Sequence, residues 1–364
     1  MRDREDLRHE PRDIGDMTKP HIPTKPRIED VAARAGISAI TVSRVLRAPA
    51  KVAPATRARV AAAIEALGYI PNLAASGLAS RRSGIVALLV PTIDNAVFAP
   101  TVEGLSDALA AAGLQLLLGD YRYSDEGERS LVRALVGRQP EALVVVGVVR
   151  DAALRAMLLR LAIPVIETWD LTEDPIDTVL GFSNHEAGAA IARHFLSRGR
   201  NRLAFVGGTD QRARARGEGF ATAIAAAGAA PPRVETADGS TIAAGRRAAA
   251  KLLAASPQGE RDAIDGIFFS SDGLAIGGLI ECRHRGIAVP GSVAIAGLGD
   301  LEIGRELTPS LTTIAIPAYE IGRRAGEIVL ARLAGAPASD PRGDPRGNER
   351  VIDLGFEIVA RESS

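Results

Sequence analysis

The chain of 364 residues contains one cysteine, Cys282, and only 4% aromatic residues. A single thiol excludes a framework of intrachain disulfides and any cysteine-rich metal site. No apolar run reaches the roughly 18 residues that a membrane-spanning helix needs. The first residues, MRDREDLRHEPRD, lack the apolar core of a secretion signal. We therefore expect a cytoplasmic protein without a membrane partner.

The motifs of common enzyme active sites are missing as well. The sequence has no phosphate-binding Walker loop and no nucleophile elbow, and Gly207-Gly208 is not a dinucleotide fingerprint. The five histidines are scattered and form no pair at metal-ligand spacing. We therefore predict no catalytic residue, no metal site and no cofactor, and do not expect an enzyme.

The formal net charge of zero conceals an uneven distribution along the chain. Residues 24–83 carry ten Lys or Arg and three acidic residues, whereas residues 84–364 have a net charge of −6. A basic segment joined to an acidic body is typical of a nucleic-acid-binding domain fused to a different module.

The stretch Ile28–Leu46 predicts two short helices joined by a tight turn at Gly36. Ser38 is placed to cap the second helix, whose apolar side packs inward. An ordinary helical hairpin is the alternative interpretation of this stretch alone. The outward side instead offers small, hydroxylated and cationic groups that suit a DNA major groove: Ala39, Ile40, Thr41, Ser43 and Arg44.

A third helix is predicted over Thr56–Leu67, with Gly68 as its left-handed cap. The pattern DVAARAGIS..TVSRVL…VAPATRARV..AIEALGYIPN..A..L, followed by RRSG, closely resembles the headpiece of the LacI (lactose/galactose repressor) family. Ala53 departs from the capping residue usual in that family. The resemblance divides the chain into an N-terminal extension expected to be disordered (1–25), a helix-turn-helix headpiece (26–70), a hinge helix (71–83) and a sensor domain (84–364).

The resemblance also implies which residues contact DNA. It assigns base reading to Ala39, Ile40 and Arg44, of which arginine can bond guanine bidentately. Phosphate contacts are expected from Ser38, Thr41, Ser43 and Thr56. In the hinge the candidates are Asn72, Ala75 and Leu78, with Leu78 as an apolar wedge in the minor groove.

From Gly84 onward, apolar strand-like runs alternate with helical stretches. The expected strands are Ile85–Val90, Leu114–Leu118, Ala142–Val146, Val165–Ile166, Thr178–Phe182, Leu203–Val206, Gly266–Phe269, Val293–Ala296 and a last strand over residues 351–363. The expected helices include Thr101–Ala112, Glu126–Arg138, His185–Arg198, Gly217–Ala227, Ile242–Leu253 and Gly273–Arg285. Alternation of this kind predicts parallel sheets, here split into two doubly wound lobes with the chain crossing between them. Ligands in such sheets bind beyond the carboxyl ends of the strands. The resemblance continues here, to the two-lobed α/β domain of the periplasmic-binding-protein type that serves the family as effector sensor and dimerisation domain.

Polar and aromatic residues at the expected strand ends are the candidate effector ligands. In the family, an arginine separated by two residues from a following Gly-Phe pair holds the effector, and Arg216 before Gly219-Phe220 matches it. Where the family usually has an acidic ligand, this chain has Gly299, so Asp300 is the substitute candidate. The full set is Asp94, Asn95, Phe98, Trp169, Asp170, Asn184, Arg212, Arg216, Ser271, Asp272 and Asp300.

Arginines together with Asp, Asn and one Trp suit a small polyhydroxylated anion. The segments GLQLLLGDYRYS and PVIETWDL resemble the gluconate-operon-repressor branch, so gluconate or a related sugar acid is the expected effector. The alternatives are a regulator of a neutral sugar or nucleobase, and a sugar-binding or sugar-processing α/β protein without a DNA role.

The expected function is therefore a transcriptional regulator, by resemblance a repressor, of a carbohydrate operon. The expected partner is double-stranded operator DNA with a near-palindromic sequence, bound by a homodimer. By family resemblance the dimer pairs through the helices Thr101–Ala112 and Gly273–Arg285.

Overall fold

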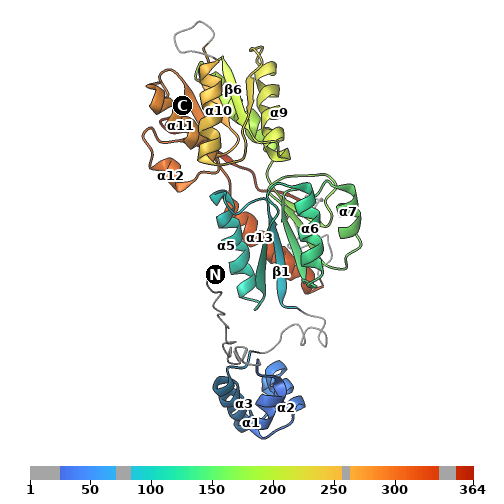
Figure 1. Ribbon diagram of the computed structural model, residues 1–364. Helices are drawn as coiled ribbons and strands as arrows, with labels where there is room; N and C mark the ends of the chain where they lie inside the picture. Colours follow the sequence, from blue (N-terminus) through green and yellow to red (C-terminus); the bar gives the residue numbers. More distant parts are fainter. Residues whose placement is uncertain (1–24, 71–82, 256–262, 336–349) are drawn as a thin grey trace, which may run out of the picture. The chain divides into compact units, whose positions relative to one another are not determined.

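The computed structural model describes residues 25–70, 83–255, 263–335 and 350–364. The chain forms two separate units, Met1–Ser80 and Arg81–Ser364. Figure 1 draws the helices and strands and labels some of them. Among the described residues, no helix is long and apolar enough to cross a bilayer.

The first unit is a small helical domain. It contains α1 (Ile28–Ala35), α2 (Ala39–Arg47), a 3₁₀ turn η1 (Pro49–Lys51) and α3 (Pro54–Leu67). The predicted turn at Gly36 has φ +63°, a conformation that glycine adopts without strain. The core is made of small side chains: Val31, Ala32, Ala35, Val42, Val60 and Ala63.

Local capping explains where these helices begin. Ser38 caps α2, because its Oγ accepts a hydrogen bond from the Thr41 backbone N–H at 3.3 Å. Pro54 is the first residue of α3, a position that suits proline because its missing N–H is not needed there. Ala53 stands at the capping position of α3 and offers no side-chain acceptor.

The second unit contains two six-stranded sheets, which define its two lobes. The first lobe has the strand order β11-β5-β4-β3-β1-β2, and the second has β12-β10-β9-β8-β6-β7. All the pairings are parallel except β12 against β10. The strands are β1 (Ile85–Val90), β2 (Gln115–Asp120), β3 (Ala142–Val146), β4 (Val165–Thr168), β5 (Thr178–Gly181), β6 (Leu203–Gly207), β7 (Arg233–Thr236), β8 (Gly266–Phe269), β9 (Ala294–Leu298), β10 (Thr312–Ala315), β11 (Val351–Asp353) and β12 (Glu357–Val359).

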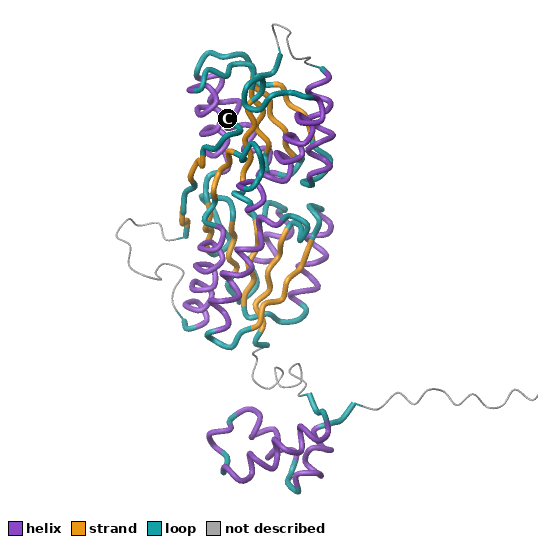
Figure 2. The backbone as a smooth tube through the Cα atoms, turned by 90° about the vertical axis from the view of Figure 1, so that its left-hand side faces the viewer, coloured by secondary structure: helices purple, strands orange, loops and turns teal. Residues whose placement is uncertain are grey.

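Helices lie on both faces of each sheet (Figure 2). They are η2 (Ala96–Phe98), α5 (Ala99–Ala110), α6 (Asp125–Val136), α7 (Ala152–Leu158), α8 (Asn184–Ser197), α9 (Gln211–Ala226), α10 (Ile242–Ala254), α11 (Asp272–Arg285), α12 (Glu302–Arg305) and α13 (Ala318–Leu333). The chain crosses between the lobes after β5, after β10 and between β11 and β12. This is the predicted two-lobed, doubly wound architecture.

Three helix pairs pack with their backbones unusually close: α5 with α13, α8 with α9, and α10 with α11. Each pair has glycine on both helices at the crossing. A methyl group placed on Gly219 of α9 would lie 1.8 Å from the carbonyl oxygen of His185 in α8. Only glycine permits this approach, so no larger residue fits at these crossings without moving the helices apart.

Several expected elements differ from those observed. The tail 351–363, expected as one strand, forms β11 in the first lobe and β12 in the second. The helix expected from Gly217 begins at Gln211, because the Asp210 carboxylate caps it by accepting the Ala213 N–H at 3.2 Å. The strands β7 and β10 and the helix α13 were not predicted from the sequence.

Candidate functional site

The outward face of α2 presents the groups predicted to read DNA. Ile40 is 74% exposed and Arg44 is exposed as well. Both line a shallow surface hollow that Ala39 and Ser43 share. The Ser43 hydroxyl accepts a hydrogen bond from Arg47 Nε at 3.0 Å, which holds a second cation at the same face.

The remaining DNA candidates lie at helix starts or outside the described residues. Ser38 and Thr41 share the first turn of α2, where their hydroxyl oxygens are 2.9 Å apart. Thr56 is half-buried in the first turn of α3. Asn72, Ala75 and Leu78 lie outside the described residues, as do residues 1–24 and most of the predicted hinge.

A cavity of about 410 Å³ is lined by residues of both lobes of the second unit. This volume is in the range of small-molecule sites. The carboxyl ends of the parallel strands border it, as the strand-end rule predicts. Six of the predicted residues line this cavity: Asn95, Phe98, Trp169, Arg212, Arg216 and Ser271.

Arg216 is buried and fixed in position by two acceptors. Its Nε donates to Asn184 Oδ1 at 2.8 Å, and its Nη1 donates to the Ser270 carbonyl at 2.6 Å. Burial lowers the pKa of Arg216 to about 10, which leaves the guanidinium charged at neutral pH. Asn184 in turn donates from Nδ2 to the Trp169 carbonyl at 2.9 Å, so one amide joins the two lobes.

Arg212 lies one helical turn before Arg216 and is held more loosely. Its Cζ is 5.4 Å from the centroid of the Phe98 ring, a cation–π contact across the cleft. Its Nε is 4.0 Å from Asp210 Oδ1, the distance limit for an ion pair. Among the described residues, Arg212 Nη1 and Ser271 Oγ are the buried side-chain polar atoms without a hydrogen-bond partner. Because a buried unpaired donor is costly, both atoms suit a ligand that supplies partners.

The first lobe supplies an apolar wall. Trp169 packs edge-on against Phe98, with ring centroids 4.8 Å apart. Its Nε1 donates to Thr101 Oγ1 at 3.0 Å, which fixes the indole in the wall. Trp169 has φ +68°, a strained backbone conformation that a functional site commonly retains.

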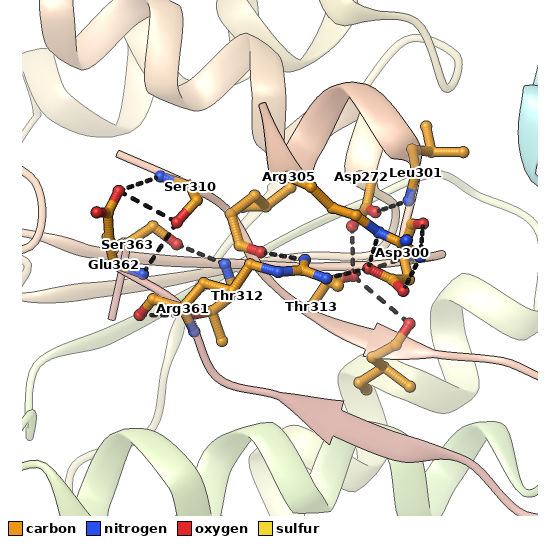
Figure 3. A network of polar contacts seen from close by, with 12 residues as sticks. Asp272, Asp300, Leu301, Arg305, Ser310, Thr312, Thr313, Arg361, Glu362 and Ser363 are labelled. Atoms are coloured by element: carbon orange, nitrogen blue, oxygen red, sulfur yellow. Dashed lines mark hydrogen bonds and ion pairs between the residues drawn. The ribbon is translucent and has the colours of Figure 1, made fainter. Parts of the chain in front are cut away.

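Five predicted effector residues do not line this cavity. Asp94 is exposed in the turn after β1, and Asn184 lies behind Arg216. Asp170 lines an adjoining, more open space of about 1200 Å³. Asp272 and Asp300 are turned into a polar network in the second lobe, shown in Figure 3.

The network explains why neither carboxylate faces the cavity. Asp272 accepts hydrogen bonds from Thr313 Oγ1 at 2.6 Å and from the Leu301 N–H at 2.8 Å. Burial raises the pKa of Asp272 to about 6, although these two bonds favour its ionised form. Asp300 forms ion pairs with Arg305 and Arg361. These contacts do not support the expectation that Asp300 replaces the acidic effector ligand for which this chain has Gly299.

The structure adds cavity residues that were not predicted from the sequence. They include Arg122 and Tyr123, Asp210, and the loop after β7 that runs from Thr236 to Ser240. Arg122, Tyr123 and Asp210 come four or five residues after predicted strand ends, and this position was a usable signal. The loop had no such signal, because β7 is an edge strand with charged and exposed residues. Among the described residues, no group of His, Cys, Asp and Glu is arranged to hold a metal ion.

A helix-turn-helix unit joined to a two-lobed domain with a ligand-sized cavity defines a class of protein: a DNA-binding regulator that responds to a small molecule. Comparison with known proteins gives the same class. Residues 27–72 match the family model "Bacterial regulatory proteins, lacI family", and residues 192–364 match "Periplasmic binding protein-like domain".

The relatives are similar over nearly the whole chain. The HTH-type transcriptional regulator GntR of Pseudomonas aeruginosa is 40% identical over 93% of this chain and 96% of its own length. A LacI family regulator from Silicibacter pomeroyi has a crystal structure with TM-score 0.83 and 34% identity, covering 93% of this chain and 99% of that one. A structure of the regulator CelR in complex with cellobiose has TM-score 0.65 and 28% identity over 93% of this chain and the whole of that one.

The chain therefore belongs to the lacI family of bacterial regulatory proteins. It is a DNA-binding transcriptional regulator and not an enzyme.

Proposed function

We propose that this regulator controls a carbohydrate-utilisation operon and that a sugar acid, with gluconate as the leading candidate, binds in the cavity between the two lobes. The observation that carries the proposal is the pair of buried, unpartnered atoms Arg212 Nη1 and Ser271 Oγ in a cavity of ligand size. A carboxylate is the acceptor that a guanidinium pairs most strongly.

The rest of the cavity supports a polyhydroxylated ligand. Asp210, Asn95 and the hydroxyl of Ser240 line it and can exchange hydrogen bonds with sugar hydroxyls. The Trp169–Phe98 wall can pack against the C–H face of a sugar. Similarity to GntR and to CelR, the latter solved with cellobiose, agrees with a carbohydrate-type effector.

In the headpiece, we assign base reading to Ala39, Ile40 and Arg44. Ile40 and Arg44 are exposed and Ala39 is half-buried beside them, and this face of α2 suits insertion into a major groove. Leu78, in the predicted hinge, is kept as the proposed minor-groove wedge. Its replacement by Ala should weaken operator binding more than binding to random DNA, since phosphate contacts remain.

We propose a homodimer on a near-palindromic operator in the cytoplasm. Of the two helices expected to pair, α11 is buried along most of its length and exposes Ile280 and its last turn, Arg283 to Arg285, whereas α5 exposes Glu103, Ser106 and Asp107. The α11 contribution to an interface is therefore narrow. Sedimentation as a clean monomer at micromolar concentration, with undiminished operator affinity, would contradict this part.

The test combines calorimetric titration of the full-length protein with gel shifts on duplex DNA from its own upstream region. The ligands are gluconate, sorbitol and adenine. Sorbitol keeps the hydroxyl groups of gluconate and lacks the carboxylate. We expect gluconate to bind roughly tenfold to a hundredfold more tightly than sorbitol, as hydrogen bonds to charged groups imply.

Two variants separate the functions of the two units. Arg44→Ala should lose operator binding and keep gluconate binding, whereas Arg212→Met should do the reverse. A calorimetric titration that shows binding of sorbitol or adenine but none of gluconate would overturn the sugar-acid assignment. Gluconate binding that leaves the gel shift unchanged would overturn its role as effector.

A further inference from the structure

The C-terminal residues of the chain are built into the polar network of the second lobe (Figure 3). Ser363 is fully buried; its Oγ donates to the Ile295 carbonyl at 2.6 Å and accepts from the Thr312 N–H at 2.8 Å. The Ile295 N–H donates to the Ser363 carbonyl at 2.7 Å. The tail is thus fixed to the amino-terminal residues of β9 and β10.

Arg361 extends from this fixed tail to the turn that comes after β9. Its Nη1 donates to the Leu311 carbonyl at 2.7 Å, and its Nη2 pairs with Asp300 Oδ1. The two side chains are only 15% and 16% exposed, so the pair is shielded from solvent. Arg305 also contacts Asp300, but its side chain is 52% exposed. Arg361 is therefore the anchored partner of the two arginines.

The turn that Arg361 holds has a backbone conformation that needs support. Gly299 has φ +137° and Asp300 has φ +51°, two successive residues with positive φ. Only glycine adopts such angles freely, and aspartate does so at some cost. The ion pair with Arg361 offsets that cost and selects one geometry for the turn.

The same turn forms part of the cavity and reaches the other lobe. Leu298, immediately before it, lines the cavity. A methyl group placed on Gly299 would lie 2.9 Å from Cγ2 of Val97, a cavity-lining residue of the first lobe. After the turn, the Leu301 N–H donates to Asp272, the residue next to Ser271 at the start of α11.

We propose that Arg361 is a positioning residue for the effector cavity. Through Asp300 it fixes the turn 299–301, and through Leu301, Thr313 and Asp272 it fixes the wall that carries Ser271. It touches no ligand itself. The inference rests on the proposed function, in which this cavity binds the effector.

The experiment compares Arg361→Met with Arg202→Met in the full-length protein. Arg202 is the matched control, because it lies in the same lobe and has the same kind of partners. Its Nε donates to the Ala263 carbonyl at 2.5 Å and its Nη2 is 3.0 Å from Asp265 Oδ2. These contacts lie at the amino ends of β6 and β8, away from the cavity.

Gluconate titration is the first readout. We expect Arg361→Met and Asp300→Asn each to raise the dissociation constant about tenfold, the double variant to add nothing, and Arg361→Lys to restore part of the affinity. The melting temperature should fall in both variants, and less in Arg202→Met, because the Arg202 side chain is 49% exposed. Equal losses of affinity in these two variants, or none in Arg361→Met, would overturn the inference.

Acrylamide quenching of the single tryptophan is a second readout that needs no ligand. Trp169 lines the cavity and is 1% exposed. We expect faster quenching in Arg361→Met than in wild type or Arg202→Met, because the turn no longer holds its contact with Val97. If wild type shows no binding of gluconate in the titration, the sugar-acid proposal fails. The quenching experiment then tests the positioning role of Arg361 alone, and equal quenching in wild type, Arg361→Met and Arg202→Met would overturn that role.

Discussion

In the headpiece, Ile40 and Arg44, which are proposed to read bases, are exposed, whereas in the second unit Arg212 and Arg216, which are proposed to bind the effector, are buried. Ile40 is 74% exposed, while Arg212 and Arg216 are each 7% exposed. The contact surface of the headpiece depends on one short helix and a small core of Val and Ala residues. The cavity depends on contacts between residues far apart in the chain.

This difference predicts where each unit is sensitive to change. Because the backbones of the cavity-bearing helices touch, the second unit should tolerate no added volume at the crossings. Because the headpiece is governed by local capping and turn geometry, its responses should be smaller and confined to one helix end. Four predictions test this contrast, from the largest expected effect to the smallest.

The largest difference is expected between two glycine-to-alanine variants, Gly219→Ala in the second unit and Gly36→Ala in the headpiece. In Gly219→Ala the new methyl group would lie 1.8 Å from a carbonyl oxygen of α8, so we expect a loss of more than about 4 kcal/mol. In Gly36→Ala nothing lies within 4 Å, and only the positive φ is penalised, by about 1–2 kcal/mol.

Hydrogen exchange in the intact chain measures both effects. Gly219→Ala should abolish protection across α8 and α9. Gly36→Ala should lower protection in α1 and α2 alone, roughly fivefold to thirtyfold for that free energy. Similar losses in the two variants would show that the helix crossings are more pliable than their geometry implies.

The next prediction compares the two cavity arginines. Arg216→Met leaves Asn184 Oδ1 and the Ser270 carbonyl without a hydrogen-bond donor. We therefore expect the free energy of unfolding to fall by about 1–3 kcal/mol and the response to the effector to be lost. Arg212→Met removes a group with an unpartnered nitrogen, so the melting temperature should stay the same or rise while gluconate affinity falls.

Thermal unfolding followed by Trp169 fluorescence and calorimetric titration separate the two outcomes. Unchanged switching in Arg216→Met, with wild-type ligand dependence, would place the charged anchor on Arg212 alone. Equal losses of stability in both variants would mean that Arg212 gains structural partners in solution beyond Phe98 and Asp210.

The same contrast explains how much of the molecule could be predicted from sequence. The headpiece was predictable because its signals are local: Gly36 ends α1, Ser38 caps α2 and Gly68 ends α3. The alternation of strands and helices likewise predicted the two lobes. Family resemblance supplied the functional interpretation.

The candidate site was predictable only in part. The strand-end rule brings Asn95, Trp169 and Arg212 to the cavity, but it cannot say which way a side chain turns. Asp300 was expected to face the ligand and instead pairs with Arg361, which is 61 residues away in sequence. A partner that distant leaves no local signal. The edge strand β7 had none either, so the loop Thr236–Ser240 was missed.

A smaller effect is expected at the start of α3, where the headpiece lacks a cap. Ala53→Ser should supply the missing acceptor and stabilise the headpiece by about 1 kcal/mol, and Ser38→Ala should remove the existing cap of α2 at a similar cost. Hydrogen exchange of α2 and α3 measures both, and Trp169 unfolding should stay the same in each variant. No gain in Ala53→Ser would indicate that water already satisfies the first turn of α3.

The smallest effect concerns a carboxyl group at the space beside the cavity. Burial, reinforced by Asp125 and Asp151 and opposed by Arg129 and Arg212, raises the pKa of Glu128 to about 7, against 4.5 in the unfolded chain. The folded state thus binds this proton more tightly, and its stabilising contribution, full below pH 4.5, is lost as the pH rises to about 7.

Glu128→Gln removes that dependence. The variant should therefore unfold at a higher temperature relative to wild type at pH 8 than at pH 5, as followed by Trp169 fluorescence. Glu126→Gln, an exposed neighbour in α6, serves as the control and should shift the midpoint by the same small amount at both pH values. A difference between wild type and Glu128→Gln that does not change with pH would show that Glu128 is hydrated in solution and that the adjoining space is open to water.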